Sequence, residues 1–274
     1  MSDNTIAFIG AGNMAVALIS GLLADGTDKQ QIIASDPDQE KCQALTSQLG
    51  IRTLQDNLQA IAEADVVVLA VKPQMLQQVA ESLSTAVQEH QPLLVSIAAG
   101  VRSDTLDAWL GGNTALVRTM PNTPAMLQAG ATGMYATDKV NDNQRAAAES
   151  VMRAVGITQW VRHENDIDAV TALSGSGPAY YFLIMEAMQS AAQELGLSSE
   201  TARLLTLQTA LGAARMAIES SDDPATLRAK VTSPGGTTEQ AIKSFENDQL
   251  REIVSRALHA AHDRSIELSE QLGK

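Results

Sequence analysis

The chain has 274 residues, of which 45% are hydrophobic, enough to bury the core of one large domain or two modest ones. Its net charge of -13 disfavours nucleic acid and anionic membrane surfaces as partners, because both are bound through basic side chains, and no apolar run approaches the ~20 residues of a membrane span. A single cysteine, Cys42, leaves no internal disulfide framework or multi-cysteine zinc site, so we expect a reduced, cytoplasmic protein.

Up to about residue 160, short apolar runs alternate with amphipathic stretches, which predicts a parallel sheet with right-handed helical crossovers. The predicted strands are residues 5–9, 31–35, 65–71, 93–97 and 115–118, and the predicted helices are residues 13–24, 38–48, 74–87 and 103–110. The run from Asp65 to Val71 is apolar on both faces, as a central parallel strand should be, and Pro73 is expected to stop it. Two further strands, 131–136 and 157–161, are expected at the sheet edge around a helix over 143–155. We therefore predict an α/β Rossmann-type domain over residues 1–162 with a mostly parallel sheet.

The pattern changes after residue 163, beyond which no convincing strand is found. Residues 178–195 and 200–218 form two long helical patterns that are apolar round most of their circumference, with small residues between the large ones. A helix that is apolar all round is buried on all sides, and so short a segment can hardly surround two such helices by itself. We therefore predict an all-α C-terminal domain over residues 163–274 that forms a homo-oligomer through these helices. The alternative is packing against the first domain alone.

A glycine-rich turn follows the first predicted strand and opens the first predicted helix, with the pattern G-x-G-x-x-A from Gly10 to Ala15. In a dinucleotide-binding turn of this kind, Gly10 permits the tight turn, Gly12 lets the pyrophosphate approach the backbone, and Ala15 lets the helix pack closely on the strand. The phosphates then lie on free N–H groups at the helix N-terminus. The alternative is a tight turn without a ligand. The predicted cofactor contacts of the turn are Gly10, Ala11, Gly12, Asn13 and Met14.

The end of the second predicted strand should help to choose between NAD and NADP. Ser35 and Asp36 lie there, and an acidic side chain can bond a ribose 2′-hydroxyl but repels a 2′-phosphate. No arginine is close in sequence to hold that phosphate, and Ser35 could accept either cofactor. The local charge therefore favours NAD without deciding the matter.

Five later segments are more specific: AVKP at residues 70–73, SIAAG at 96–100, RTMPNTP at 118–124, ALSGSGPAY at 172–180 and VTSPGGTT at 231–238. In this order and spacing, together with the turn at Gly10, they resemble the pyrroline-5-carboxylate reductase family over essentially the whole chain. The resemblance implies reduction of 1-pyrroline-5-carboxylate to L-proline, the last step of proline biosynthesis, by hydride transfer from a nicotinamide to a cyclic imine. It also implies NADPH as the usual cofactor, with NADH as a second option, and dimers with intertwined domains that can assemble further.

Two of these segments end strands of the predicted parallel sheet, where ligands bind, so their backbones are expected to line the dinucleotide crevice. They comprise Ala70, Val71, Lys72 and Pro73 in one and Ala98, Ala99 and Gly100 in the other. An ordinary strand-to-helix turn is the alternative for each, and Lys72 is expected to contribute its backbone rather than a catalytic amine. By resemblance, the stiff loop with Asn122 and Thr123 lies beside the nicotinamide. Asn57 resembles a family contact to the adenine-side ribose, with a helix-capping role as the alternative.

The segments 174–178 and 233–238 each place glycines and hydroxyls at a helix start, where free N–H groups suit an anion. Pro178 suits a first helical turn, and Thr237 or Thr238 could cap a helix that begins near Glu239, so structural capping is the alternative to ligand binding. By resemblance, the second segment binds the substrate carboxylate and Thr238 is the catalytic hydroxyl at the ring nitrogen. The residues that the resemblance assigns to the substrate are Glu164, Ser233, Gly235, Gly236, Thr237 and Thr238. From composition alone, Glu164 fits a solvated surface charge as well as it fits a substrate contact.

A protonated imine is already an electrophile, so this chemistry needs no strong general acid, and the sequence offers no obvious one. The four histidines form no cluster with metal-ligand spacing. A 3-hydroxyacid dehydrogenase is the nearest alternative enzyme, but it needs a catalytic lysine one turn into the first long helix, and residues 179–183 contain none. The alternative outside enzymes is a non-catalytic NAD(P)-binding sensor, which would show no turnover.

Overall fold

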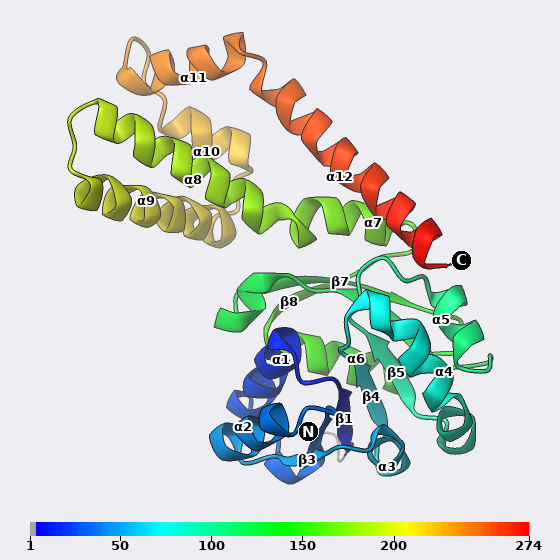
Figure 1. Ribbon diagram of the computed structural model, residues 1–274. Helices are drawn as coiled ribbons and strands as arrows, with labels where there is room; N and C mark the ends of the chain where they lie inside the picture. The colour runs from blue at the N-terminus through cyan, green and yellow to red at the C-terminus, as the bar shows by residue number, and fades with distance from the viewer. Residues whose placement is uncertain (1–3, 274) are drawn as a thin grey trace. The chain divides into compact units, whose positions relative to one another are not determined.

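The computed structural model describes residues 4–273, which pack as two compact units (Figure 1). The first unit contains the residues up to Ser176 together with those from Ala261 onward, and the second contains residues 177–260. This division differs from the predicted boundary after residue 162. Two segments account for the difference, because the short helix α7 (Asp166–Val170) packs against the sheet and the end of the C-terminal helix also belongs to the first unit.

The first unit is built on an eight-stranded sheet in the order β3-β2-β1-β4-β5-β6-β7-β8. Its strands are β1 (Ile6–Ile9), β2 (Ile32–Ser35), β3 (Arg52–Leu54), β4 (Val66–Leu69), β5 (Leu93–Ser96), β6 (Leu116–Met120), β7 (Gly130–Ala136) and β8 (Gly156–Trp160). All neighbours pair in parallel except β6 and β7, which are antiparallel. The predicted mostly parallel Rossmann-type sheet is therefore confirmed. The expectation that β7 lies at an edge is wrong, because β8 pairs with its free side.

Helices cover both faces of this sheet, as Figure 1 shows for the first unit. They are α1 (Asn13–Ala24), α2 (Gln39–Leu49), α3 (Asn57–Ala62), α4 (Pro73–His90), α5 (Ser103–Trp109) and α6 (Asp142–Arg153), with α7 after β8. Strand side chains alternate between two cores, so that Phe8 packs in the core that includes Leu18, and Ile9 packs in the core that includes Leu76. Pro73 does not end β4, which stops at Leu69; it begins α4, where a missing N–H costs nothing.

The second unit is helical. It contains α8 (Gly177–Glu194), α9 (Ser199–Glu219), α10 (Pro224–Lys230), α11 (Thr237–Asn247) and the start of α12 (Leu250–Leu272), whose end belongs to the first unit. The described residues after Trp160 contain no strand, which confirms the predicted change to helix. Within residues 4–273, no helix combines the length and the apolarity that crossing a membrane would require.

The long helices α8 and α9 expose much of their apolar surface in the single chain. Tyr181 and Leu183 on α8 are 66% and 65% exposed, and Leu204, Leu211 and Met216 on α9 are exposed by more than half of their surface. The two helices pack against each other. The expectation that they are buried on all sides is therefore not met within one chain, and so large an apolar surface indicates a further interaction.

Candidate cofactor and substrate sites

Four predicted cofactor segments follow four neighbouring strands at the same edge of the sheet. The glycine-rich turn follows β1, residues 70–73 follow β4, residues 98–100 follow β5, and the loop with Asn122 and Thr123 follows β6. Because β2, β1, β4, β5 and β6 are parallel neighbours, their carboxyl ends lie at one edge. Ligands of such sheets bind at this edge, beside the point where the strand order reverses, which here is at β1.

The glycine-rich turn has the geometry that a pyrophosphate needs. Gly10 has φ +102, and a Cβ there would lie 2.7 Å from the carbonyl oxygen of Ala70, so only glycine fits. Gly12 is the N-cap of α1, and a Cβ built on it would meet nothing within 4 Å. Ala15 is fully buried, in the same core cluster as Phe8 of β1. The start of α1 therefore presents N–H groups without a capping side chain, with open space in front of them.

Asp36 does not point at a ribose site but at the backbone of this turn. Its Oδ2 accepts a hydrogen bond from Ala11 N at 2.9 Å and its Oδ1 accepts one from Asp38 N at 3.0 Å. The residue is only 7% exposed, and Lys41 Nζ lies 3.5 Å from Oδ2. This geometry weakens the charge argument for NAD, because the carboxylate is neutralised within the chain. Lys41, in the first turn of α2, is a basic residue close to the end of β2, although no arginine is.

Two buried side-chain oxygens of the described chain have no hydrogen-bond partner, and both belong to predicted cofactor residues. They are Ser35 Oγ, at the end of β2, and Asn57 Oδ1, at the start of α3. A buried polar atom without a partner is costly, so each indicates a group that the chain alone does not supply. The helix-capping alternative for Asn57 is wrong, because the N-cap of α3 is Asp56. These orphaned oxygens and the open space over Gly12 fit a bound dinucleotide.

The segments after β4 and β5 differ in how far they are free to contact a cofactor. Lys72 is the N-cap of α4, its side chain is exposed, and it makes no capping hydrogen bond, which agrees with a backbone role. Ala98 is buried and Ala99 is exposed. Gly100 has φ +75, and a Cβ there would lie 3.1 Å from Leu272 at the end of α12. Its positive φ and its packing against α12 therefore suffice to explain why residue 100 is a glycine, without a close approach of the cofactor.

Of the two predicted residues in the loop after β6, Asn122 is held by hydrogen bonds and Thr123 is exposed. Asn122 Nδ2 donates to the carbonyl oxygen of Ser174 at 2.9 Å, and its Oδ1 accepts from Ala131 N at 2.9 Å. Thr123 is exposed and begins a short 3₁₀ turn. These two bonds leave the amide a second N–H and a second lone pair, and a cofactor contact of Asn122 stays a prediction.

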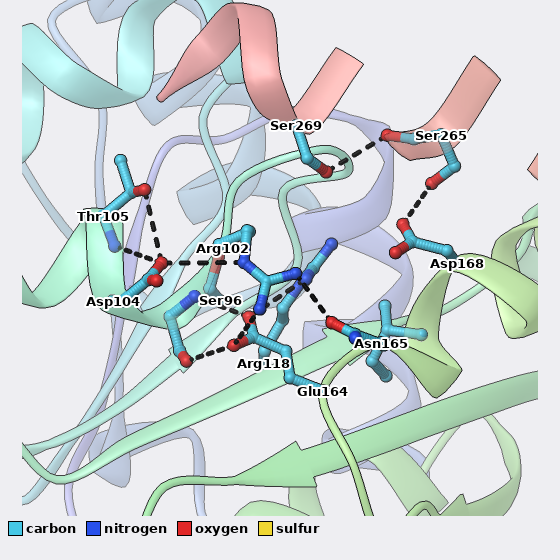
Figure 2. A network of polar contacts seen from close by, with 12 residues as sticks. Ser96, Arg102, Asp104, Thr105, Arg118, Glu164, Asn165, Asp168, Ser265 and Ser269 are labelled. Carbon is cyan, nitrogen blue, oxygen red and sulfur yellow. Dashed lines mark hydrogen bonds and ion pairs between the residues drawn. The ribbon is translucent and has the colours of Figure 1, made fainter. Parts of the chain in front are cut away.

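Glu164 lies at the centre of a partly buried polar network (Figure 2). Its Oε1 accepts from Ser103 N at 2.6 Å and from Arg118 Nη1 at 3.0 Å, and its Oε2 accepts from Ser103 Oγ at 2.7 Å. Arg102 completes the group, with Nη2 3.5 Å from Oε2. The alternative of a solvated charge at Glu164 is therefore wrong. A substrate contact of Glu164 stays a prediction, because its oxygens already hold β6 and the start of α5.

Arg118 is a partner of Glu164 that was not predicted from the sequence. It is 2% exposed and lies in β6, among residues that are otherwise apolar or small and polar. A charged side chain in a strand covered on both faces needs a buried partner, and that rule is the signal that could have found it.

The predicted substrate segment forms the start of α11 in the second unit. Gly236 is the N-cap of this helix and makes no side-chain capping bond, so the expectation that Thr237 or Thr238 caps it is wrong. Thr237 and Thr238 are the first two helical residues and, like Ser233, are exposed. The hydroxyls are therefore free of the capping role that was the alternative to ligand binding.

The N–H groups of this loop are only partly used within the chain. Gly235 has φ +72 and donates its N–H to Glu239 Oε2 at 3.0 Å, and Gly236 N donates to the carbonyl oxygen of Ser233 at 3.0 Å. The hydrogen bond from Gly235 and the neighbouring Lys243 lower the pKa of Glu239. An incoming carboxylate would thus meet the N–H groups of Thr237 and Thr238, at the positive end of the helix dipole. In residues 4–273, no cluster of three or more histidine, cysteine or acidic side chains could hold a metal ion.

Comparison with known proteins decides the family. A family model described as pyrroline-5-carboxylate reductase dimerisation matches residues 164–268, and one described as NADP oxidoreductase, coenzyme F420-dependent, matches residues 5–100. Pyrroline-5-carboxylate reductase of Pseudomonas aeruginosa is 54% identical over 274 residues, which is 100% of both chains. The chain belongs to the pyrroline-5-carboxylate reductase family.

Other pyrroline-5-carboxylate reductases match over nearly the same length. Pyrroline-5-carboxylate reductase 2 of Bacillus subtilis is 35% identical over 268 residues, which covers 97% of this chain and 95% of the relative. A solved reductase from Coxiella burnetii shares 50% identity with a TM-score of 0.95, covering 98% of this chain and 99% of that one. Pyrroline carboxylate reductase of Plasmodium falciparum, solved with NADP bound, shares 27% identity with a TM-score of 0.86, over 98% and 99% of the two chains.

Proposed function

We propose that the chain reduces 1-pyrroline-5-carboxylate to L-proline, the last step of proline biosynthesis, with NADPH as the preferred hydride donor and NADH as a second one. The observation that supports this most directly is the open start of α1 at Gly12, in a chain that matches pyrroline-5-carboxylate reductases over its whole length. The bound cofactor supplies the hydride. The residues of this chain hold the cofactor and the imine.

The cofactor side of the proposal assigns a separate task to each free group. The N–H groups from Gly12 onward bind the pyrophosphate, and the orphaned oxygens of Ser35 and Asn57 bind the ribose at the adenine end. A preference for NADPH is supported by the neutralised Asp36, whose carboxylate bonds the turn and pairs with Lys41. It is also supported by the NADP bound in the Plasmodium falciparum relative.

The substrate side of the proposal uses the start of α11. The substrate carboxylate binds the N–H groups and hydroxyls of the loop from Ser233 to Thr238, and the Thr238 hydroxyl bonds the ring nitrogen. The C=N carbon of a protonated imine accepts hydride without a further acid, which suits a loop in which Glu239 has a lowered pKa and is ionised at neutral pH. Neutral N–H groups also explain how a chain with net charge -13 could hold an anionic substrate.

The deciding experiment follows NADPH and NADH oxidation with racemic 1-pyrroline-5-carboxylate and compares kcat/KM for the two cofactors. We expect turnover with both and a higher kcat/KM for NADPH. Binding of cofactor without any turnover would favour the non-catalytic sensor instead. Turnover of 3-hydroxyacids would favour the other dehydrogenase class, which the absence of a lysine from residues 179–183 speaks against.

Replacing Thr238 by alanine should lower kcat with the imine by about 10- to 100-fold, the value of one hydrogen bond to a charged group. NADPH affinity, measured by fluorescence titration, should change little, because the start of α1 is untouched. Thr238→Ser keeps the hydroxyl and should retain most of the activity. A parallel loss of turnover and cofactor affinity in Thr238→Ala would refute the assigned role.

We further propose that the chain is a homo-oligomer through its C-terminal helices. The exposed apolar faces of α8 and α9 support this, as does the match of residues 164–268 to a dimerisation family. Light scattering should give at least twice the chain mass of 29.0 kDa. Leu211→Asp on α9 should lower that mass, whereas Gln78→Asp on the exposed face of α4 should not; a monomeric wild type would contradict the proposal.

A cytoplasmic location stays a prediction, in keeping with the single buried thiol of Cys42.

A further inference from the structure

We propose that Asn122 is a positioning residue for hydride transfer: its amide fixes the loop after β6 against the helical turn that precedes α8. The inference rests on the proposed function, because it assumes that this loop borders the reacting end of the cofactor. The loop follows the last of the parallel strands that share the ligand-binding edge. Pro121 and Pro124 flank the asparagine and make the loop stiff. The contacts of the Asn122 side chain with neighbouring segments can therefore fix the position of the whole loop.

Both ends of the Asn122 amide are engaged, and they join three separate segments. Nδ2 donates to the carbonyl oxygen of Ser174, and Oδ1 accepts from Ala131 N at the start of β7, both at 2.9 Å. The residue is 9% exposed. Because the donor and the acceptor are used by different segments, an ionised aspartate of the same size could replace only one of the two bonds.

The Ser174 carbonyl needs this donor for a reason that is visible in the sequence. Residues 171–175 form a single π-helical turn, closed by the bond from Ser176 N to the carbonyl oxygen of Thr171 at 2.8 Å. In a continuing α-helix, the carbonyl of Ser174 would accept from the N–H four residues later, but that residue is Pro178, which has no N–H. Asn122 supplies the donor that Pro178 lacks.

A second contact ties the same loop to the same turn. A Cβ built on Gly175 would lie 2.5 Å from the terminal methyl of Met120, so the Met120 side chain occupies the space in front of this glycine. Met120 is the last residue of β6 and leads directly into the loop. The loop is therefore held to the π turn by the hydrogen bond of Asn122 and by the close packing of Met120. Of these two contacts, only the hydrogen bond requires a defined orientation of the side chain.

The test compares two substitutions that remove different parts of the amide. Asn122→Asp keeps an acceptor for Ala131 N but, when ionised, loses the donor to Ser174 and sets a negative charge against its carbonyl oxygen. Asn122→Ala loses both bonds. We expect both to lower kcat by about 10- to 100-fold at saturating substrates, because misplacement of reacting groups by about an ångström costs this much. The KM for NADPH should change by less than about threefold, because the turn at Gly10 is untouched.

A pH profile separates positioning from general loss of structure. Protonation restores a donor to Asn122→Asp but not to Asn122→Ala, so the kcat of the former, relative to wild type, should rise as the pH falls from 8 to 6. Thr119→Val is the matched control, because it removes a different buried hydrogen bond from β6, between Thr119 Oγ and the carbonyl oxygen of Ser96. It should lower the melting temperature and leave kcat near the wild-type value.

The outcomes are distinct from those of the proposed function. Wild-type turnover tests the reductase activity, whereas only the ratio of variant to wild type tests Asn122. Wild-type kcat in folded Asn122→Asp and Asn122→Ala would overturn the inference. So would a rise in the KM for NADPH as large as the fall in kcat, because that would make Asn122 a cofactor ligand instead.

Discussion

Gly12→Val is expected to abolish cofactor binding while the protein stays folded. A Cβ at this position meets nothing within 4 Å, and Gly12 has φ -78, which any residue can adopt. The valine side chain therefore has room in the free chain but fills the space that the pyrophosphate needs to reach the backbone N–H groups. Titration with NADPH should show a loss of affinity of at least ~100-fold, equivalent to about 2.7 kcal/mol. The cost in stability should be below about 1 kcal/mol, since valine is a poorer N-cap than glycine.

Two matched substitutions sharpen this prediction. Gly12→Ser introduces a favoured N-cap residue, so the melting temperature should hold or rise while cofactor affinity still falls. Gly10→Ala, two residues earlier, should instead unfold the turn, because its Cβ would lie 2.7 Å from the carbonyl oxygen of Ala70 and its φ is +102. If Gly12→Val bound NADPH as tightly as wild type, the assignment of this turn to the pyrophosphate would be wrong.

The sequence was sufficient for those parts of the fold that depend on local patterns. The apolar run of β4 and the start of α1 at Gly12 follow from residues within a few positions of each other, and both are found where they were predicted, give or take a few residues. By contrast, β3 has the sequence Arg-Thr-Leu and no apolar run, and it is a strand only because it pairs with β2. The interior place of β7 likewise depends on its pairing with a distant strand.

The candidate site likewise has parts that could be predicted from local sequence and parts that could not. The backbone positions at Gly10 and Gly12 could be predicted, because a turn motif specifies backbone geometry locally. The side-chain partners of Asp36, Asn122 and Glu164 could not, because each bonds a segment far away in the sequence. Asp36 illustrates the consequence: its charge pointed to NAD when taken alone, but in the fold it holds the turn and pairs with Lys41.

Glu164→Ala is expected to be the most destabilising single change in the network of Figure 2. It leaves the guanidinium of Arg118, which is 2% exposed, without its carboxylate at 3.0 Å. Breaking a buried ion pair by removing one partner costs about 3–5 kcal/mol, because the remaining charge is buried and uncompensated. The bonds to Ser103 N and Oγ at the start of α5 are lost as well. Urea unfolding of the variant should show a midpoint well below that of wild type.

The cause of this loss can be tested by removing the other partner as well. In Arg118→Met/Glu164→Ala, neither member of the pair leaves an unpaired buried charge, so the double variant should be more stable than Glu164→Ala alone. The bonds that Ser103 loses are the same in both variants, and their cost therefore cancels from the comparison. A double variant less stable than Glu164→Ala would mean that Arg118 has another partner in the fold, and that the stranded charge is not the reason for the destabilisation. Glu164→Gln, which keeps a neutral acceptor of the same size, should fall between wild type and Glu164→Ala, because it can still accept from Ser103 but no longer neutralises Arg118.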